Sequence, residues 1–194
     1  MLIVGTDEAA VEADLVNGHL ACPNCGAGLR PWGYGIERDV RLVENTERRR
    51  FRRSFCRSCS CTHVLVHEDT LVRRRDSAEV IAMALTAKAR GDGHRRIARA
   101  LGRPASTVRG WLRRFASRAD AIREHFTRWA HFVAVALDHR SVAESAFSDA
   151  VSAIGMLGMV AVRRFGPRPV WSMASFVTGG GLLCNTSSPF RRPT

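Results

Sequence analysis

Lysine is almost absent from this sequence, because Lys88 is the only one among 194 residues. Acidic residues are also few, with 18 against 30 basic residues, so that arginine carries most of a net charge of +12. A protein with such an excess attracts polyanions, of which DNA and RNA are the commonest. The alternative is a solvated basic surface that reflects a coding bias towards arginine.

Long apolar runs are absent as well. The longest run, residues 150–162, has thirteen residues, whereas a transmembrane helix needs about 20. The run therefore predicts a buried helix and no membrane span. The N-terminus has no basic leader and turns acidic at once, so we expect an intracellular, cytoplasmic protein. Clustered cysteines in that reducing compartment indicate metal ligands rather than disulfides.

Signatures of common enzymes are missing too, since the sequence has no P-loop, nucleophile elbow or HExxH motif. Acidic and histidine residues after residue 114 are scattered over helical patterns, with no strands to bring them together: Asp120, Glu124, His125, His131, Asp138, His139, Glu144 and Asp149. The neighbours Asp138 and His139 are more typical of a helix end than of an acid–base pair. We expect no catalytic activity and see no sign of a small-molecule substrate.

Four cysteines do form a pattern. Cys22 and Cys25 have the spacing C-x2-C, and Cys56 and Cys59 repeat it after thirty intervening residues. Two such turns supply the four thiolates of a closed, tetrahedral, structural zinc site. The sequence therefore predicts one Zn²⁺ ion held by these four side chains. Gly26 suits the first turn, because glycine readily adopts a positive φ.

Two further metal-ligand types follow the second pair and leave alternatives open. Cys61 is expected to be a packed thiol, whereas His63 could replace Cys59 as the fourth ligand. A redox-active pair is a weaker interpretation, because a thioredoxin-like motif occurs singly and within a βαβ unit.

Strand-like segments at 39–44, 48–55 and 62–68 lie between and after the two cysteine pairs. This order of turn, strands, turn and strand is that of a zinc ribbon. Some fifty residues bury little apolar surface, whereas zinc binding supplies roughly 10 kcal/mol or more. That contribution is comparable with the roughly 5–15 kcal/mol that stabilise a whole domain. We therefore expect the metal to decide whether this part folds.

From Ser77 onwards the apolar residues recur with helical spacing. Ser77 is a suitable N-cap for a helix over 77–90, and Gly102 fits the turn before a second helix over 105–116. Small and apolar residues take the positions that close the core of a helix-turn-helix: Ile97, Ala98, Leu101, Val108, Trp111 and Leu112. Arg103 departs from the pattern, since an apolar residue usually follows the turn glycine, and we expect its guanidinium to extend outward.

The helix over 105–116 would present its N-terminal residues to base edges in the major groove. Ser106 and Arg109 are the candidates for base contacts, and an arginine can bind guanine through two hydrogen bonds. Phosphate contacts are expected from polar and basic residues of both helices: Arg95, Arg96, Thr107, Arg113 and Arg114. The arginines at 73–75 are expected to add phosphate contacts, whereas for those at 48–53 a solvated strand face is an equal alternative. A helical hairpin that packs against protein remains the alternative interpretation of the whole unit.

Three segments carry a family resemblance: FCRSCSCTHVLV, RRRDSAEVIAMAL and GHRRIARALGRPASTVRGWLRRF. They resemble a group of bacterial proteins, common in actinobacteria, that join a zinc ribbon to a homeodomain-like helix-turn-helix. The group is similar to the N-terminal DNA-binding regions of insertion-sequence transposases. The resemblance spans roughly residues 20–130 and implies binding to double-stranded DNA. Ser60 stands where many ribbons carry glycine, which makes the second turn less favourable.

These patterns predict a mainly α protein with a small N-terminal β zinc ribbon, a homeodomain-like helix-turn-helix and a C-terminal helical region. The expected boundaries are a partly disordered segment at 1–18, the ribbon at 19–72, the helix-turn-helix at 73–118, the helical region at 119–180 and a flexible tail at 181–194.

The C-terminal helical region is expected to contain helices over 141–165 and 171–178, both apolar on more than one face. Such surplus apolar surface favours either a core that closes over the helix-turn-helix or a homodimer, whose two-fold symmetry would suit paired DNA half-sites. We expect a DNA-binding protein, either a transcriptional regulator or an accessory factor of a mobile element. The alternatives are a non-catalytic adaptor in a transcription or recombination complex and, more remotely, RNA binding by the ribbon.

Overall fold

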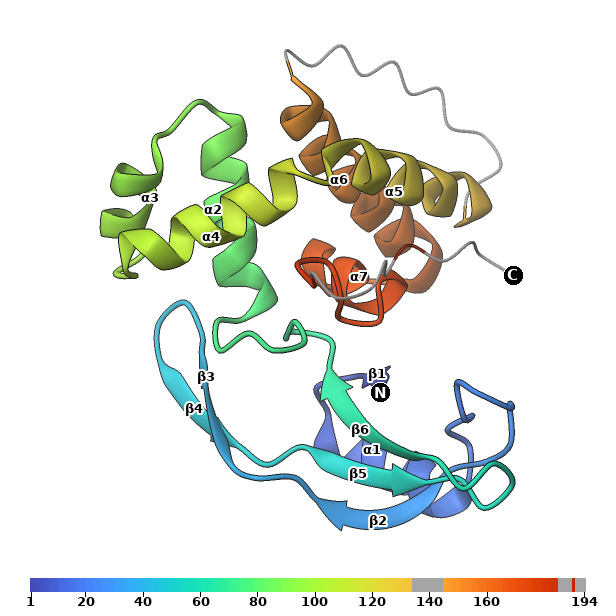
Figure 1. The fold of residues 1–194 in the computed structure, drawn as a ribbon. Helices are drawn as coiled ribbons and strands as arrows, with labels where there is room; N and C mark the ends of the chain where they lie inside the picture. Colours follow the sequence, from blue (N-terminus) through green and yellow to red (C-terminus); the bar gives the residue numbers. More distant parts are fainter. Residues whose placement is uncertain (134–144, 185–189, 191–194) are drawn as a thin grey trace.

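The structure is a computed structural model that describes residues 1–133, 145–184 and 190. Figure 1 shows an N-terminal β part below a helical part. The strands are β1 (Leu2–Val4), β2 (Arg30–Tyr34), β3 (Arg38–Arg41), β4 (Thr46–Arg49), β5 (Arg52–Phe55) and β6 (Thr62–His67). The helices are α1 (Glu8–Asn17), α2 (Ala78–Ala89), α3 (His94–Ala100), α4 (Ala105–Ala116), α5 (Ala119–Val133), α6 (Ala146–Phe165) and α7 (Val170–Val177).

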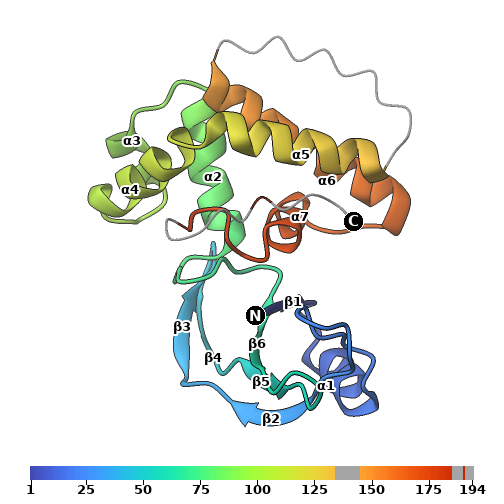
Figure 2. The same cartoon turned by 45° about the vertical axis from the view of Figure 1, so that its right-hand side comes forward.

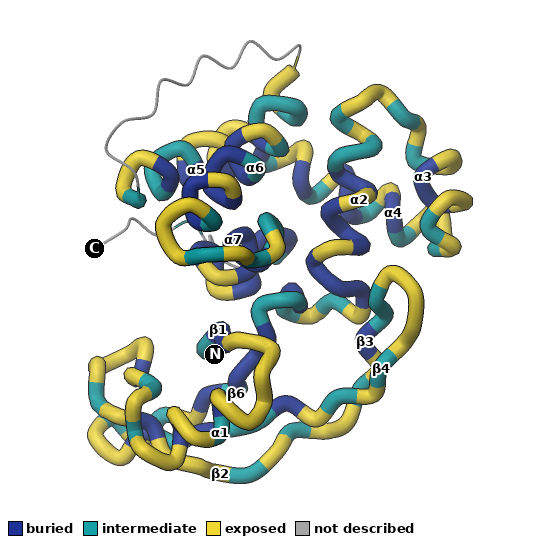
Figure 3. Tube along the Cα trace, turned by 180° about the vertical axis from the view of Figure 1, so that it is seen from behind, coloured by how far each residue is buried: buried dark blue, intermediate teal, exposed yellow. Residues whose placement is uncertain are grey.

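Four strands form one sheet in the order β1-β6-β5-β2, and β3 pairs with β4 as a separate hairpin. β5 is antiparallel to both β2 and β6, whereas β1 runs parallel to β6. α1 covers one face of the sheet and lies behind it in Figure 1 and in front of it in Figure 3. The opposite face carries Arg53 and Phe55, because successive strand residues point to opposite faces and Ser54, between them, is fully buried.

The N-terminal segment, for which the sequence predicted partial disorder over 1–18, contains β1 and α1 instead. Asp7 caps α1 by accepting hydrogen bonds from two backbone N–H groups at 3.0 and 3.1 Å, and Gly18 ends the helix at φ +74°. Leu15 is fully buried in a cluster that includes Leu65 of β6. β1 pairs with β6, whose residues lie some sixty positions away in the sequence. A local sequence pattern does not reveal such a distant pairing.

The strands after the first cysteine pair are shorter than predicted. The segment predicted at 39–44 ends as a strand at Arg41, and the one predicted at 48–55 is divided between β4 and β5. Phe51 lies at the division and packs against Val40 in a second, small core cluster. Buried Phe51 therefore interrupts the arginine run at 48–53 and separates the β3–β4 hairpin from the main sheet.

α2, α3 and α4 form the helix-turn-helix. α4 begins and ends where the sequence predicted, and the Ser77 hydroxyl accepts a hydrogen bond from the Val80 N–H at 3.3 Å, as expected of an N-cap. Gly102 adopts φ +60° in the turn. Of the predicted core residues, Leu101 is half-buried and the others are buried: Ile97, Ala98, Val108, Trp111 and Leu112.

α5, α6 and α7 pack together beside the helix-turn-helix, as Figure 2 shows. By length and composition α6 is apolar enough to cross a membrane, but 44% of its most apolar window is buried within the protein. One such helix is weak evidence for a membrane span, because core helices share these features. α6 and α7 occupy the regions predicted at 141–165 and 171–178, except that residues 141–144 lie outside the described residues.

The segment predicted as a flexible tail at 181–194 begins with packed residues. Leu182 and Leu183 are buried, and Arg74 donates a hydrogen bond to the Leu183 carbonyl oxygen at 2.7 Å. Leu183 therefore lies against the segment that precedes α2. Apart from Phe190, the rest of this tail lies outside the described residues.

A buried carboxylate connects the ribbon to the helix-turn-helix. Asp76, whose side chain is 3% exposed, accepts hydrogen bonds from Arg41 of β3 at 2.6 Å and from Arg103 of the α3–α4 turn at 2.5 Å. Arg103 also donates to the Leu42 carbonyl oxygen at 3.1 Å. Its side chain thus turns inward, contrary to the expectation from sequence, because Asp76 compensates its charge. The hairpin is thereby attached to the turn that precedes α4.

Asp76→Asn keeps the shape of this side chain but leaves two partly buried arginines without a carboxylate. We expect the substitution to lower the free energy of unfolding by about 3 kcal/mol, because removing one partner of a buried ion pair leaves an uncompensated charge. Urea denaturation measures this difference. Glu124→Gln is the control, because it breaks an exposed pair with Arg128 that is worth less than about 0.5 kcal/mol. Equal stability of the two variants would contradict the assignment.

Candidate metal centre and nucleic-acid interface

Each C-x2-C pair lies in a tight turn at the same end of the sheet. In the first turn the Gly26 N–H donates to the Cys22 carbonyl oxygen at 2.8 Å, and in the second the Cys56 N–H donates to the Cys61 carbonyl oxygen at 2.9 Å. Both turns need the left-handed backbone region, with φ +76° at Gly26 and φ +57° at Ser60. The main chain of each turn therefore directs its two sulfur atoms to one side.

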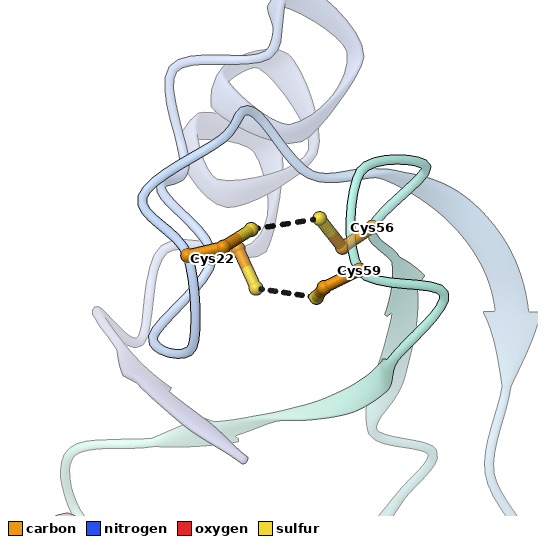
Figure 4. Close-up of side chains that lie close together, drawn as sticks. Cys22, Cys56 and Cys59 are labelled. Carbon is orange, nitrogen blue, oxygen red and sulfur yellow. Dashed lines mark hydrogen bonds between the residues drawn. The ribbon is translucent and has the colours of Figure 1, made fainter.

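The four sulfur atoms of Cys22, Cys25, Cys56 and Cys59 lie within 4.8 Å of one another. The Cys22 and Cys59 sulfurs are 3.7 Å apart, and the Cys25 and Cys56 sulfurs are 3.5 Å apart, as Figure 4 shows in close-up. Bonds of about 2.3 Å from a tetrahedral Zn²⁺ to sulfur would place the sulfurs about 3.8 Å apart. The cluster thus has a geometry that fits one metal ion, consistent with zinc.

The pKa values of two of these thiols are shifted because the sulfur atoms lie close together. The Cys59 N–H lowers the pKa of the Cys56 thiol to about 6, and neighbouring sulfurs assist it. The Cys61 N–H lowers the pKa of the Cys59 thiol, but burial and the other three sulfurs raise it more, so that this pKa lies well above its ordinary value. Four thiolates cannot coexist at this spacing without a cation, because like charges disfavour one another. A divalent ion would provide that charge.

Cys61 and His63 lie beside this cluster. Asn24 donates a hydrogen bond to the Cys61 sulfur at 3.2 Å. The Nε2 atom of His63 lies 3.3 Å from the Cys22 sulfur, within reach of an N–H···S hydrogen bond. The structure thus groups the four predicted cysteines and leaves His63 as a neighbour that can orient a ligand, as second-layer partners of metal sites do.

We expect one equivalent of zinc per chain and none after the double change Cys22→Ser and Cys59→Ser, which removes half the ligands. A strong chelator should unfold the ribbon, because metal binding contributes on the order of 10 kcal/mol. Elemental analysis and circular dichroism measure the two effects. Cys61→Ser is the matched control and should keep its zinc. A metal-free chain with an intact ribbon would contradict this assignment.

The Ser60 backbone offers a second test of the site. A non-glycine residue in the left-handed region carries about 1 kcal/mol of strain or more, so Ser60→Gly should raise the free energy of unfolding by up to about 1 kcal/mol. Gly26→Ser should lower it by a similar amount, and no atom within 4 Å would obstruct the added Cβ. Thermal unfolding of zinc-loaded protein compares the two. Midpoints that shift in the same direction would disprove the backbone explanation.

The exposed face of α4 forms a shallow groove of about 400 Å³. Its lining includes most of the residues predicted to contact DNA and, within the described residues, no acidic side chain: Arg74, Ser106, Thr107, Arg109, Gly110, Trp111, Arg113 and Arg114. Ser106, Arg109 and Arg113 are exposed, whereas Thr107 and Arg114 are half-buried. The groove is therefore a concentrated basic surface along a helix.

Arg74 is the residue of this groove that sequence analysis did not single out from the run at 73–75. Burial and the nearby Arg114 lower the pKa of its guanidinium, and its hydrogen bond to Leu183 fixes its position. No local pattern distinguishes it from Arg73 and Arg75, because its place depends on the distant C-terminal segment.

The two predicted contacts on α3 lie apart from the α4 groove. Arg95 is exposed, and Arg96 pairs with Asp92 at 3.2 Å. Arg96 instead lines a second groove of about 550 Å³ between α2 and α3, which also includes Met83 and Trp171. The structure thus collects five of the seven predicted DNA-contacting residues into one surface.

The acidic and histidine residues considered for catalysis do not converge in the described part of the chain. Asp120 and Glu124 are exposed on α5, whereas His125 is fully buried and its Nε2 atom lies 3.1 Å from the Val177 carbonyl oxygen. Asp138, His139 and Glu144 lie outside the described residues. In that described part the cysteine cluster is the only group of potential metal ligands.

Residues 75–123 match the family model of a homeodomain-like domain. The match covers about a quarter of the chain and contains α2, α3 and α4 with the start of α5. Neither the curated proteins nor the solved structures provide a match. A homeodomain-like helix-turn-helix supports DNA binding in general. DNA binding in turn suggests a location in the cytoplasm or at the nucleoid. The resemblance to transposase regions stays a hypothesis.

Proposed function

We propose that this chain is a non-catalytic DNA-binding protein that reads duplex DNA with α4. The observation that supports this proposal most strongly is the α4 groove, where arginines lie along a helix without a neighbouring acidic side chain in its described lining. A helix of this width fits the major groove, and concentrated arginine favours the phosphate backbone. The homeodomain-like match over the same residues supports the same orientation.

The residues of the groove divide by position. Ser106 and Arg109 lie in the first turns of α4 and are exposed, as expected of residues that reach base edges. Thr107, Arg113 and Arg114 flank them and would bind phosphates, together with Arg74 and, from α3, Arg95. Arg96 is the weakest candidate, because it is paired with Asp92.

The ribbon serves in this proposal as a zinc-stabilised support for the reading helix. Its hairpin is attached to the α3–α4 turn through Asp76, so that ribbon and reader move together. The cellular role is that of a transcriptional regulator or of an accessory factor of a mobile element, located in the cytoplasm with the nucleoid.

A homodimer through the C-terminal helices completes the proposal. Large apolar side chains are exposed there at 52–59% of their area: Phe132, Met159, Phe165 and Phe176. Burial of such side chains against a second copy would be favourable. A two-fold dimer would present two copies of α4 to two half-sites of DNA.

The second candidate function is that of a non-catalytic adaptor in a transcription or recombination complex. It is favoured by the groove between α2 and α3, where Met83 is 44% exposed and Trp171 forms one wall. Apolar grooves with methionine suit the apolar face of a partner helix.

Duplexes selected from a random pool test the main proposal. Arg109→Ala should weaken binding of the selected sequence by about tenfold or more and reduce discrimination against other sequences, because a base contact is lost. Arg113→Ala should weaken all duplexes equally and lower the slope of log affinity against log salt by about 0.9. Fluorescence anisotropy at several salt concentrations measures both effects.

Arg163→Ala is the matched control, because Arg163 is an exposed arginine in the last turn of α6, outside the α4 groove. Its binding should equal that of the unaltered chain. A folded, zinc-loaded protein without affinity for any duplex at low salt would refute DNA reading and favour the adaptor.

A further inference from the structure

The arginines of the ribbon form two groups. Arg48, Arg49 and Arg52 are ion-paired, with the carboxylates of Glu37, Asp69 and Glu12 at 3.2, 2.8 and 2.7 Å. Arg30 and Arg53 have no carboxylate partner in the described part of the chain, and Arg30 is held by the Val16 carbonyl oxygen at 3.3 Å. The second group therefore has charge available for an anion.

Arg53 lies on the same sheet face as an aromatic pair. Trp32 is 57% exposed, more than the other three tryptophans, and its ring centroid lies 5.1 Å from that of half-buried Phe55. Strand register places Arg53 two residues before Phe55 on the sheet face away from α1, and the contact of the Trp32 ring with Phe55 brings it to the same face. The Arg30 guanidinium instead reaches the Val16 carbonyl oxygen of α1. The exposed Trp32 ring thus packs against Phe55 on a sheet face that also carries the positive charge of Arg53.

Two properties of this surface identify its occupant. An indole that packs against Phe55 on the face of a sheet cannot reach a base inside a stacked duplex, but it can stack on an unpaired one. The Arg53 guanidinium complements a phosphate next to such a base and disfavours an apolar protein surface, which would bury uncompensated charge. A single-stranded nucleic acid satisfies both properties.

The sheet face away from α1 is on the same side of the molecule as the exposed side of α4. In Figure 1, α1 lies behind the sheet and α2 behind α4, and in Figure 3, from the opposite side, α1 and α2 are in front. A strand that emerges from a duplex on α4 would therefore be on the correct side of the molecule to meet Trp32. This placement favours DNA over RNA, and only that choice rests on the proposed function.

We propose that Trp32 and Phe55, with Arg53, form a stacking site on the ribbon for an unpaired base of single-stranded DNA.

Titration of the zinc-loaded full chain with oligo(dT) tests this site. Binding should quench the tryptophan fluorescence, because Trp32 is the most exposed tryptophan and would stack on a base. Trp32→Ala should abolish the quenching and weaken binding by about tenfold, whereas Trp32→Phe should retain most of the affinity, since its ring can still stack. Arg53→Gln should lower the salt slope by about 0.7. Trp32 is largely exposed, so its truncation leaves the fold intact, as thermal unfolding would verify.

Tyr34→Ala is the matched control, because it removes an exposed aromatic side chain of β2 that lines a groove with Glu8 and Glu12 of α1 and should bind oligo(dT) like the unaltered chain. The double variant Arg109→Ala, Arg113→Ala should also retain oligo(dT) binding while losing duplex binding, which separates this site from α4. Unchanged affinity of Trp32→Ala, or no binding of oligo(dT) at low salt, would overturn the proposal. Preferential binding of oligo(U) would overturn the choice of DNA.

Discussion

The ribbon depends on four sulfur atoms held closer together than four thiolates can remain without a cation. Cys22 precedes β2 and Cys56 follows β5, so the ion that would compensate this charge also fixes the pairing of these two strands. Cys22 and Cys56 themselves belong to the small core cluster beneath α1. Metal binding at this cluster would therefore stabilise the same few residues as apolar packing, and neither would suffice alone in a part of this size.

Ion pairs connect the part of the chain that carries the cysteines to the turn before α4. β2 leads directly into the hairpin, and Arg41 of that hairpin shares Asp76 with Arg103, one residue before the N-cap of α4. A buried carboxylate that joins two arginines adds geometric specificity, since each guanidinium has a fixed set of donor directions. The final described segment adds a second attachment through Arg74. The turn before α4 and the segment before α2 are thus both fixed by hydrogen bonds within the fold, which would reduce the ordering cost of binding a partner.

Local patterns predicted those features whose physical cause is local. The Ser77 cap, the Gly102 turn and the apolar spacing of α4 all act within a few residues, and the helix-turn-helix follows them. The spacing within each cysteine pair likewise directs its two sulfurs to one side of a tight turn, whereas the contacts between the pairs join residues 37 and 31 positions apart. The inward orientation of Arg103 and the strand β1 were not predicted, because they depend on partners 27 and about sixty residues away. A lone sequence shows that such residues are charged or apolar but does not indicate which distant partner compensates them.

The same reasoning changes the meaning of the net charge. Several arginines that raise the total to +12 are consumed within the fold, since Arg41, Arg49, Arg52 and Arg103 compensate carboxylates. Arginines without such a carboxylate in the described chain include Arg109 and Arg113 on α4 and Arg30 and Arg53 on the ribbon. Because a polyanion responds to local uncompensated charge rather than to the total, the ion pairs help to determine where nucleic acid can bind. By neutralising the arginines that build the junction, they leave the positive potential on the exposed side of α4 and the open face of the sheet.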